Sequence, residues 1–325
     1  MNNTENLLEI QDLSVEFRTD DGVVKAVNHM NLQLQRGKTL GLVGETGAGK
    51  TTTALSILRL IPDPPGVITG GSIRLGDTDI LAAGKREMEK LRGSQVSMIF
   101  QDPMTSLNPV LPVGEQIAEV YLLHDKISLQ EAEKKAGEML ELVGIPASRG
   151  KDYPHQFSGG MKQRVVIAMA LACNPMLLIA DEPTTALDVT IQAQVLKLMK
   201  ELKAKYNTAM LMITHDLGIV AEVCDEVSVM YAGRVVEHGT LEDVFEHTAH
   251  PYTEGLFNSI PNIDARTHRL VPIHGLMPDP TNLPAGCPFA PRCSKATPAC
   301  QAALPRRTQL SDTHYVCCTL FEKGE

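Results

Sequence analysis

Residues 44–51 have the types and the spacing needed to bind the phosphates of a nucleotide. Their sequence, Gly-Glu-Thr-Gly-Ala-Gly-Lys-Thr, fits the phosphate-loop pattern G-x-x-x-x-G-K-[ST]. A short apolar run at 39–43 precedes the loop and a helical pattern at 51–60 follows it, as expected for a buried parallel strand and the start of a helix. Glycines let the backbone approach phosphate oxygens closely, and a helix N-terminus adds partial positive charge.

A second apolar run, 176–180, ends in the carboxylates Asp181 and Glu182. In a phosphate-loop site, Lys50 would contact the β- and γ-phosphates, while Thr51 and Asp181 would hold Mg²⁺. Glu182 would polarise the attacking water as a general base. An acidic pair that merely caps a strand is the simpler interpretation, but the pair follows the loop at the distance expected within one domain. The predicted nucleotide contacts of the loop are Gly44, Glu45, Thr46, Gly47, Ala48, Gly49, Lys50, Thr51 and Thr52.

Length and charge limit the class of protein. A chain of 325 residues has room for about two domains. The net charge of -9 argues against a protein that neutralises nucleic-acid backbones. No N-terminal stretch resembles a signal peptide, and no apolar run reaches the length of a membrane span. We therefore expect a cytosolic protein that meets a membrane only through a partner or its surface.

The pattern of segments divides the chain near residue 245. Before that point, strand-like and helix-like segments alternate, which predicts an α/β fold with a mostly parallel sheet. The charged residues at 113–143 fall on one face of predicted helices. After residue 245, prolines become frequent and hydrophobic periodicity fades, so we expect a second, small and loop-rich domain over 246–325.

The cysteines are concentrated at the C-terminal end. Five of the seven lie in the last forty residues: Cys287, Cys293, Cys300, Cys317 and Cys318. In a cytosolic chain such a cluster favours a metal over disulfides. Four thiolates suit Zn²⁺ or an iron–sulfur cluster, and the tight C-x-x-C pairs typical of zinc ribbons are absent. Because few large apolar residues follow Phe289, we expect a metal to stabilise this domain, far from the nucleotide.

A Ser-Gly-Gly sequence at 158–160 and a histidine at 215 complete a series of motifs. In their order, these motifs resemble the ATP-binding-cassette (ABC) ATPases over about residues 7–245. The resemblance implies a cassette in residues 1–245, with a RecA-like core, an antiparallel β subdomain and a helical subdomain at about 103–172. It also implies that two cassettes enclose two ATP molecules, so that Ser158, Gly159 and Gly160 close over the nucleotide of another chain.

Other residues acquire roles through the same resemblance. Gln101 would sense Mg²⁺ and water, and His215 would contact the γ-phosphate. Phe17 would stack on adenine, and Asp188 would end the D-loop at the cassette dimer interface. Without the resemblance, His215 is more simply a satisfied polar residue, and Phe17 a core aromatic.

The signature itself departs from the family pattern. It reads Phe-Ser-Gly-Gly-Met, and Met161 stands where the family usually has glutamine. Methionine lacks the amide donor of glutamine, so the competence of this half-site would depend on Ser158 and the backbone. Taken alone, the Ser-Gly-Gly sequence is more simply a helix N-cap.

Two further segments narrow the resemblance. Residues 101–109 and 250–253 resemble the ATPase subunits of bacterial dipeptide and oligopeptide importers, particularly the D-type subunit. The implied activity is ATP hydrolysis that drives import. The implied partners are a second ABC ATPase of the F type, forming a heterodimer, two transmembrane permease subunits and, indirectly, an extracytoplasmic solute-binding protein. The protein would lie peripherally on the cytoplasmic face of the membrane, without a nucleic-acid partner.

The cysteine spacing also resembles this family, whose four cysteines can hold a [4Fe-4S] cluster. The resemblance assigns Cys287, Cys293 and Cys300 as ligands. The pattern His-x-Val-x-Cys ends at Cys318, which favours it as the fourth ligand over Cys317. Zn²⁺ is the alternative metal.

Three alternative functions follow from the same motifs. Among transporters, an importer of nickel or another small solute is the nearest alternative to a peptide importer. A soluble ABC ATPase acting on DNA or ribosomes usually has two cassettes or a long coiled-coil insertion, and neither is present. A non-hydrolytic, ATP-binding regulatory subunit is disfavoured because Lys50, Asp181, Glu182 and His215 are all present.

Overall fold

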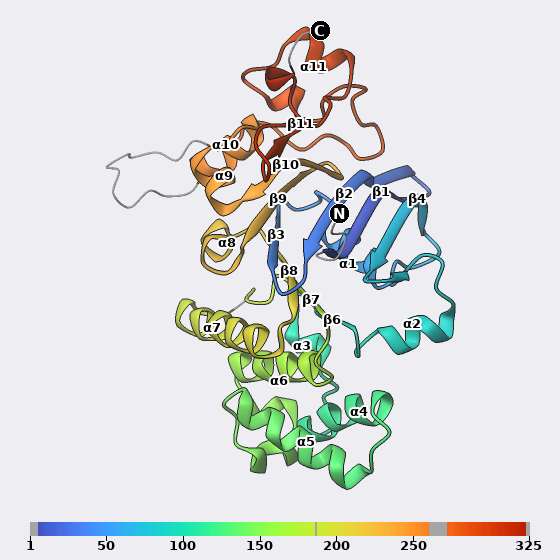
Figure 1. The fold of residues 1–325 in the computed structure, drawn as a ribbon, viewed down its shortest axis with the longest axis vertical. Coiled ribbons are helices and arrows are strands. Elements are labelled where there is room, and N and C mark those ends of the chain that lie inside the picture. The colour runs from blue at the N-terminus through green and yellow to red at the C-terminus, as the bar shows by residue number, and fades with distance from the viewer. Residues whose placement is uncertain (1–5, 186, 260–271, 323–325) are drawn as a thin grey trace. The chain divides into compact units, whose positions relative to one another are not determined.

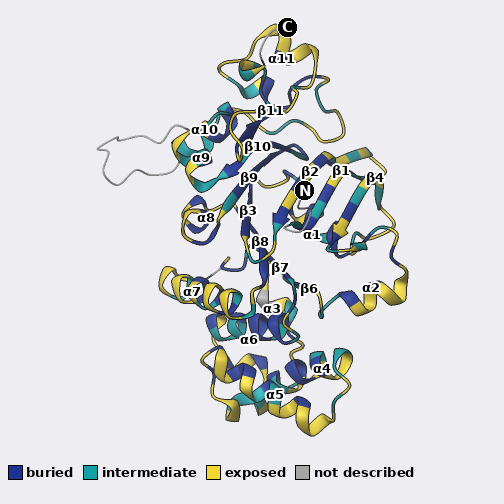
Figure 2. Ribbon diagram, viewed as in Figure 1, coloured by how far each residue is buried: buried dark blue, intermediate teal, exposed yellow. Residues whose placement is uncertain are grey.

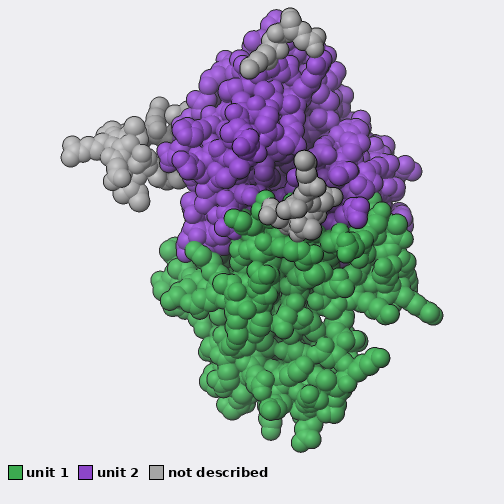
Figure 3. All heavy atoms as spheres, viewed as in Figure 1, with its two compact units in different colours: residues 1–7, 34–39, 75–213 green, residues 8–33, 40–74, 214–325 purple. Residues whose placement is uncertain are grey.

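The computed structural model describes residues 6–185, 187–259 and 272–322, and the chain divides into two compact units (Figure 3). Unit 1 contains residues 1–7, 34–39 and 75–213, and unit 2 contains residues 8–33, 40–74 and 214–325. The phosphate loop and the C-terminal cysteines therefore belong to the same unit. The domain boundary at 245 and the helical subdomain at 103–172 stay predictions.

Unit 1 contains a buried parallel sheet, as the sequence predicts. The strands β6 (Val96–Ile99), β7 (Leu177–Asp181) and β8 (Ala209–Thr214) lie in the order β6-β7-β8 (Figure 1). Both pairs are parallel, with Val96 opposite Leu177 and Leu177 opposite Ala209. Every residue of β7 and β8 is buried. Such continuous apolar runs are typical of strands covered on both faces.

Helices make up most of the rest of unit 1, and they begin where the sequence provides capping residues. Ser128, Ser158 and Asp188 each accept a hydrogen bond from a backbone N–H of the helix that follows, which satisfies one of its free donors. Asn207 ends the last of these helices with a φ of 52°. The helices are α2 (Lys85–Leu91), α3 (Pro103–Ser106), α4 (Val113–His124), α5 (Leu129–Leu142), α6 (Gly159–Leu171) and α7 (Val189–Tyr206). The short elements are β5 (Thr78–Asp79) and the 3₁₀ turns η1 (Ala147–Lys151) and η2 (Pro154–Gln156).

Unit 2 contains the remaining strands. The long strands β1 (Asn6–Thr19) and β2 (Gly22–Gln35) are joined by a short turn and lie with β4 (Gly66–Leu75) in the order β2-β1-β4. The strand β3 (Thr39–Val43), which leads to the phosphate loop, is fully buried (Figure 2) and pairs in parallel with β9 (Glu226–Tyr231). The strand β9 also pairs antiparallel with β10 (Arg234–Thr240), which follows it in the chain.

Short elements complete unit 2. The helices are α1 (Lys50–Ile57), α8 (Leu217–Val223), α9 (Leu241–Glu246), α10 (Pro251–Asn258) and α11 (Pro298–Ala302). The other elements are η3 (Ala290–Arg292), β11 (Thr308–Gln309), β12 (Tyr315–Val316) and η4 (Thr319–Phe321). None of the helices in the described parts of the chain is long and apolar enough to span a bilayer.

A buried carboxylate anchors the C-terminal segment to β10. Glu237 is 0% exposed and accepts hydrogen bonds from the backbone N–H groups of Ala249, at 2.7 Å, and His250, at 3.0 Å. Its Oε1 also lies 3.0 Å from Nε2 of His314. Beside this contact, β12 pairs antiparallel with β10, so that Val316 lies opposite Glu237. Glu237 thus joins β10 to the segment at 249–250 and to His314 near the C-terminal end.

Phe289 anchors the C-terminal segment in an aromatic cluster. Phe289 is buried, and its ring centroid lies 5.3 Å from that of Tyr231 and 5.4 Å from that of Tyr252. The two tyrosine rings are 4.6 Å apart. The count of apolar residues after residue 289 missed this aromatic cluster because its other members lie earlier in the chain.

Candidate nucleotide site

The phosphate loop in unit 2 has the backbone conformation that its glycines permit. Gly44, Gly47 and Gly49 have φ angles of 155°, 85° and 101°, a region that residues with a Cβ rarely adopt. A Cβ on Gly44 would also collide with the carbonyl oxygen of Met230, and one on Gly49 with that of Ala26. Glycine is therefore favoured at all three positions by the backbone conformation, and at Gly44 and Gly49 also by the close approach of neighbouring backbone.

Lys50 begins α1 directly after the loop. It is 7% exposed, and its Nζ donates to the carbonyl oxygens of Gly44, at 2.6 Å, and Glu45, at 3.0 Å. The ammonium group therefore lies at the loop, where the sequence predicts the phosphates. The predicted Mg²⁺ ligand Thr51 is exposed in the first turn of α1, and Thr52 beside it is half-buried.

Glu45 is held by residues from the C-terminal part of the chain. Its carboxylate accepts two hydrogen bonds from Arg292, of 2.7 Å from Nη1 and 3.0 Å from Nη2. Its backbone N–H donates to the hydroxyl of Tyr252 at 2.9 Å. The expectation that the C-terminal domain lies far from the nucleotide residues is therefore wrong. The residue patterns did not assign Arg292 or Tyr252 to the site. The available signal for Arg292 was the carboxylate within a phosphate loop, because such a carboxylate needs a cation beside it.

In unit 1, the side chains of Gln101 and Thr185 converge on the carboxylate of Glu182. Glu182 follows the buried Asp181 at the end of β7, and its φ is 47°. Its Oε2 accepts hydrogen bonds from Nε2 of Gln101, at 3.0 Å, and from Oγ1 of Thr185, at 2.9 Å. Its backbone N–H donates to the carbonyl oxygen of Ile213 at 2.8 Å. The glutamine at 101 and the general-base candidate, separated by 81 residues in sequence, are therefore neighbours.

The signature residues start α6, also in unit 1. The hydroxyl of Ser158 accepts from the backbone N–H of Met161 at 3.4 Å, so the helix-cap interpretation is confirmed. Gly160 is buried, and a Cβ there would collide with Ile191. One turn later, the buried Gln163 donates to the carbonyl oxygen of Pro183 at 2.5 Å. This bond ties the signature helix to the loop that carries Glu182.

The other residues predicted to contact the nucleotide are Phe17, His215, Asp188 and Gly159. Phe17 is half-buried on β1, and a Cβ on Gly66 would approach its ring to 2.9 Å. His215 is exposed between β8 and α8. Asp188 caps α7 by accepting from the backbone N–H of Ile191 at 3.0 Å, and Gly159 is exposed beside Ser158. The adenine, γ-phosphate and dimer roles of these residues stay predictions.

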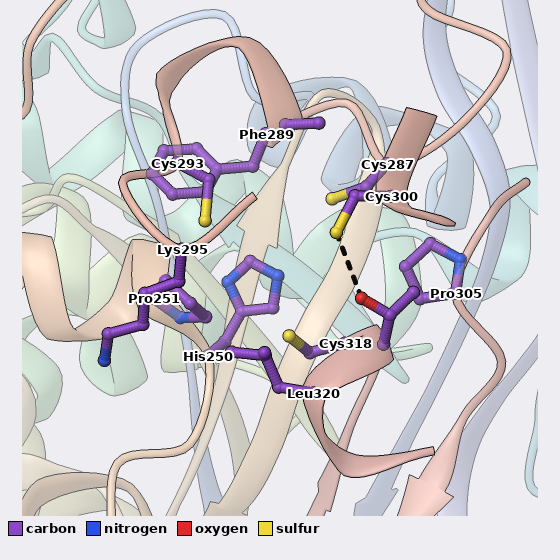
Figure 4. Close-up of a pocket in the computed structure, with 12 residues that line it drawn as sticks. His250, Pro251, Cys287, Phe289, Cys293, Lys295, Cys300, Pro305, Cys318 and Leu320 are labelled. Atoms are coloured by element: carbon purple, nitrogen blue, oxygen red, sulfur yellow. Dashed lines mark hydrogen bonds between the residues drawn. The ribbon is translucent and has the colours of Figure 1, made fainter. Parts of the chain in front are cut away.

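Four of the five C-terminal cysteines line one pocket in unit 2. The sulfur atoms of Cys287, Cys293, Cys300 and Cys318 face this pocket, which has His250 at its side (Figure 4). Cys317 does not line it, and its backbone N–H instead donates to the carbonyl oxygen of Val236 at 2.8 Å. Successive side chains of an extended segment point to opposite sides, so the two neighbouring cysteines have different surroundings.

The thiols of this pocket are only loosely gathered. Burial raises the pKa of Cys318 to about 11. Burial would also raise the pKa of Cys300, but hydrogen bonds with Thr297 and Thr319 lower it below the ordinary value. The predicted metal-binding character of this domain is not supported by the geometry, because the residues that the structure describes include no group of three or more His, Cys, Asp or Glu placed to hold a metal ion.

Comparison with known proteins identifies the family. The family described as "ABC transporter" matches residues 27–185, and that described as "Oligopeptide/dipeptide transporter, C-terminal region" matches residues 236–300. The oligopeptide transport ATP-binding protein OppD of Bacillus subtilis is 52% identical over 313 residues, which are 95% of this chain and 87% of that protein. The chain belongs to the family of ABC transporter ATP-binding proteins.

Other members of this ABC family extend the comparison. The dipeptide transport ATP-binding protein DppD of Bacillus subtilis is 50% identical over 98% of this chain and 96% of its own length. OppD of Escherichia coli is 52% identical over 92% of this chain and 89% of its own. Among solved structures, the dimeric post-hydrolysis state of the ATP-binding cassette MJ0796, bound to ADP and Pi, has a TM-score of 0.65 and 25% identity, covering 72% of this chain and 98% of that one. The predicted ABC ATPase fold and activity are thereby confirmed.

Proposed function

We propose that this chain is the ATP-hydrolysing motor subunit of a membrane importer for dipeptides and oligopeptides. The observation that carries hydrolysis is the arrangement around Glu182, where Gln101 and Thr185 hold one carboxylate oxygen directly after the strand that ends in Asp181. The names of the relatives and the match of residues 236–300 to a peptide-transporter region support peptides as the transported class.

In this proposal, each predicted site residue has a distinct role toward the nucleotide. Backbone N–H groups of the loop at 44–51 and the ammonium of Lys50 bind the ATP phosphates. Thr51, Gln101 and Asp181 hold Mg²⁺, which neutralises charge on the phosphates. Glu182 orients the attacking water and accepts its proton. His215 contacts the γ-phosphate, and Phe17 stacks on adenine.

The proposed assembly is a pair of cassettes on two membrane permeases. Ser158, Gly159 and Gly160 complete the nucleotide site of the second cassette, which we propose is a related F-type subunit, and Asp188 lies at the interface between the two. ATP binding closes the pair of cassettes, and this closure moves the permeases. Hydrolysis then re-opens the pair. The chain would then lie peripherally on the cytoplasmic side, and a solute-binding protein would deliver the peptide.

The peptide function predicts a specific import defect. A bacterial strain that lacks this chain should lose uptake of labelled oligopeptides and keep uptake of free amino acids. Wild-type chain should restore import, whereas the Glu182→Gln variant should not. Restored uptake of labelled nickel without any uptake of peptides would instead assign the importer to the metal, which is the alternative substrate.

The two-cassette site predicts complementation between inactive chains. Lys50→Ala removes the phosphate contact of a chain, and Ser158→Arg blocks the site that the chain completes in its partner. Each variant alone should be nearly inactive as an ATPase. In the absence of the F-type subunit, where this chain would pair with itself, a mixture should regain activity because one of the two sites in a mixed pair retains an intact loop opposite an intact signature. ATPase activity of wild-type chain should also rise with protein concentration, whereas a constant rate from a verified monomer would contradict the model.

We also propose that the pocket of Cys287, Cys293, Cys300 and Cys318 holds a metal centre. The four facing thiols form a donor set that suits a [4Fe-4S] cluster, with Zn²⁺ as the alternative. A metal would require the thiols to move closer together, since they are not spaced for one in this structure. The centre would supply stability to its surroundings.

Metal analysis distinguishes the possibilities. Anaerobically purified protein should contain about four irons and four sulfides per chain for a [4Fe-4S] cluster, or about one zinc for the alternative. Cys318→Ser should remove the metal, whereas Cys317→Ser, the matched control outside the pocket, should retain it. Metal-free wild-type protein would contradict both forms of the proposal.

A further inference from the structure

The guanidinium of Arg292 lies beside the phosphate loop and makes several hydrogen bonds. Its side chain is 6% exposed, and all its N–H-bearing atoms have acceptors. Besides the two bonds to Glu45, Nη1 donates to the hydroxyl of Tyr231 at 3.3 Å, and Nη2 and Nε donate to the carbonyl oxygens of Ile273, at 3.4 Å, and His274, at 3.0 Å. A planar guanidinium held on every side fixes the carboxylate that it binds.

The backbone of Glu45 is fixed independently of its side chain. The hydroxyl of Tyr252, which accepts from the Glu45 N–H, belongs to a ring that is 0% exposed. That ring packs against Tyr231 and Phe289, and the guanidinium of Arg292 lies 5.8 Å and 6.0 Å from the centroids of these two rings. One rigid aromatic cluster therefore holds both the backbone and the side chain of Glu45.

This fixation reaches the lysine of the loop. The carbonyl oxygens of Gly44 and Glu45 both accept from the ammonium of Lys50. A flexible loop would lose conformational entropy when it closed around phosphates, and a fixed loop avoids much of that loss. The position of Glu45 thus sets both the shape of the loop and the place of its lysine.

The ion pair between Glu45 and Arg292 also reduces electrostatic repulsion in the loop. An unpaired carboxylate in a phosphate loop would repel the negatively charged phosphates, and repulsion is strong where water is partly excluded. Arg292 neutralises that charge through two short bonds. The partner comes from 247 residues further along the chain, so the C-terminal region contributes directly to the loop.

We propose that Arg292 is a positioning residue of the nucleotide site, which holds Glu45 and thereby keeps the loop at 44–51 in its phosphate-binding conformation. The inference rests on the proposed function only in that the loop binds Mg·ATP. It gives the region after residue 245 a role in nucleotide affinity, separate from any metal in the cysteine pocket.

The test measures the affinity for Mg·ATP by titration and the ATPase kinetics of the full chain. Arg292→Ala should raise the Kd about tenfold, the effect of losing one charged hydrogen-bonded pair, and should raise KM in parallel while kcat falls less than twofold. Lys295→Ala is the matched control. It removes a cation from the same segment, where Lys295 pairs with Glu254 in an ion pair whose side chains are each 50% exposed, and it should leave the Kd unchanged.

A double variant separates positioning from charge repulsion. Glu45→Gln in the same chain removes the repulsion of an unpaired carboxylate but does not restore the hold on residue 45, so it should recover less than half of the affinity that Arg292→Ala loses. Arg292→Lys should give an intermediate Kd because lysine keeps the charge but not the two-point bond. Thermal unfolding of each variant reports whether the segment remains folded.

The outcomes are distinct. An unchanged Kd in Arg292→Ala would overturn the inference, and so would full recovery of affinity by the double variant, because the defect would then be charge repulsion and not a loss of position. Lys50→Ala should abolish binding whatever Arg292 does. If wild-type chain failed to bind Mg·ATP, the proposed function would fall and the inference with it.

Discussion

The variant Glu182→Gln should bind Mg·ATP with wild-type affinity and hydrolyse it about 10²- to 10⁴-fold more slowly, the usual effect of losing a general base. Glutamine preserves the shape of the side chain and can still bond with Gln101 and Thr185, but it cannot accept a proton from water. Single-turnover hydrolysis in the assembled transporter, together with nucleotide titration, measures both effects.

Thr185→Val is the matched control for this experiment. It removes one hydrogen bond to the same carboxylate oxygen but leaves the carboxylate in place, so turnover should fall by much less than in Glu182→Gln. If Glu182→Gln turned over at a rate near that of wild type, the base would have to be another residue. The ATP-loaded variant should also accumulate in the closed, paired state.

The variant Glu237→Ala should lower the free energy of unfolding of the C-terminal region by about 3–5 kcal/mol, since it leaves several buried donors unsatisfied. The affected groups are the N–H groups of Ala249 and His250 and the ring of His314. Thermal unfolding and limited proteolysis after residue 245 measure the effect.

Two substitutions test the cause. Glu237→Gln keeps one acceptor oxygen and should be intermediate in stability. Glu242→Ala removes an exposed carboxylate from α9 and should change the stability by less than about 0.5 kcal/mol. A tail in Glu237→Ala that resists protease as well as the wild type would show that the strand pairing alone suffices to hold this region.

The parts of the site that are local in sequence were predictable. The glycines of the phosphate loop are dictated by backbone conformation, and the strand that ends in Asp181 is recognisable by its apolar run. The caps at Ser158 and Asp188 follow from short-range hydrogen bonding. Each of these inferences needs only a few neighbouring residues, so the sequence contains all the required information.

Contacts between distant segments were not predictable in the same way. Residue patterns alone do not bring Gln101 to Glu182, and only the family resemblance suggested a shared site. The pairing of Arg292 with Glu45 was missed because no periodicity links positions so far apart. That Cys318 lines the pocket while Cys317 does not depends on the path of the chain beside β10, which no residue pattern shows.

The position of β12 beside β10 has a consequence for solubility. If the chain were shortened at residue 245, β10 would become an edge strand with unpaired backbone N–H and C=O groups, and such edges can recruit strands from other molecules. In the full chain the outermost strand is instead β11, which is two residues long and directly follows Arg306 and Arg307. Short strands flanked by charge resist such recruitment. The C-terminal segment therefore protects the sheet from aggregation, and we expect the shortened chain to self-associate even where its nucleotide residues are intact.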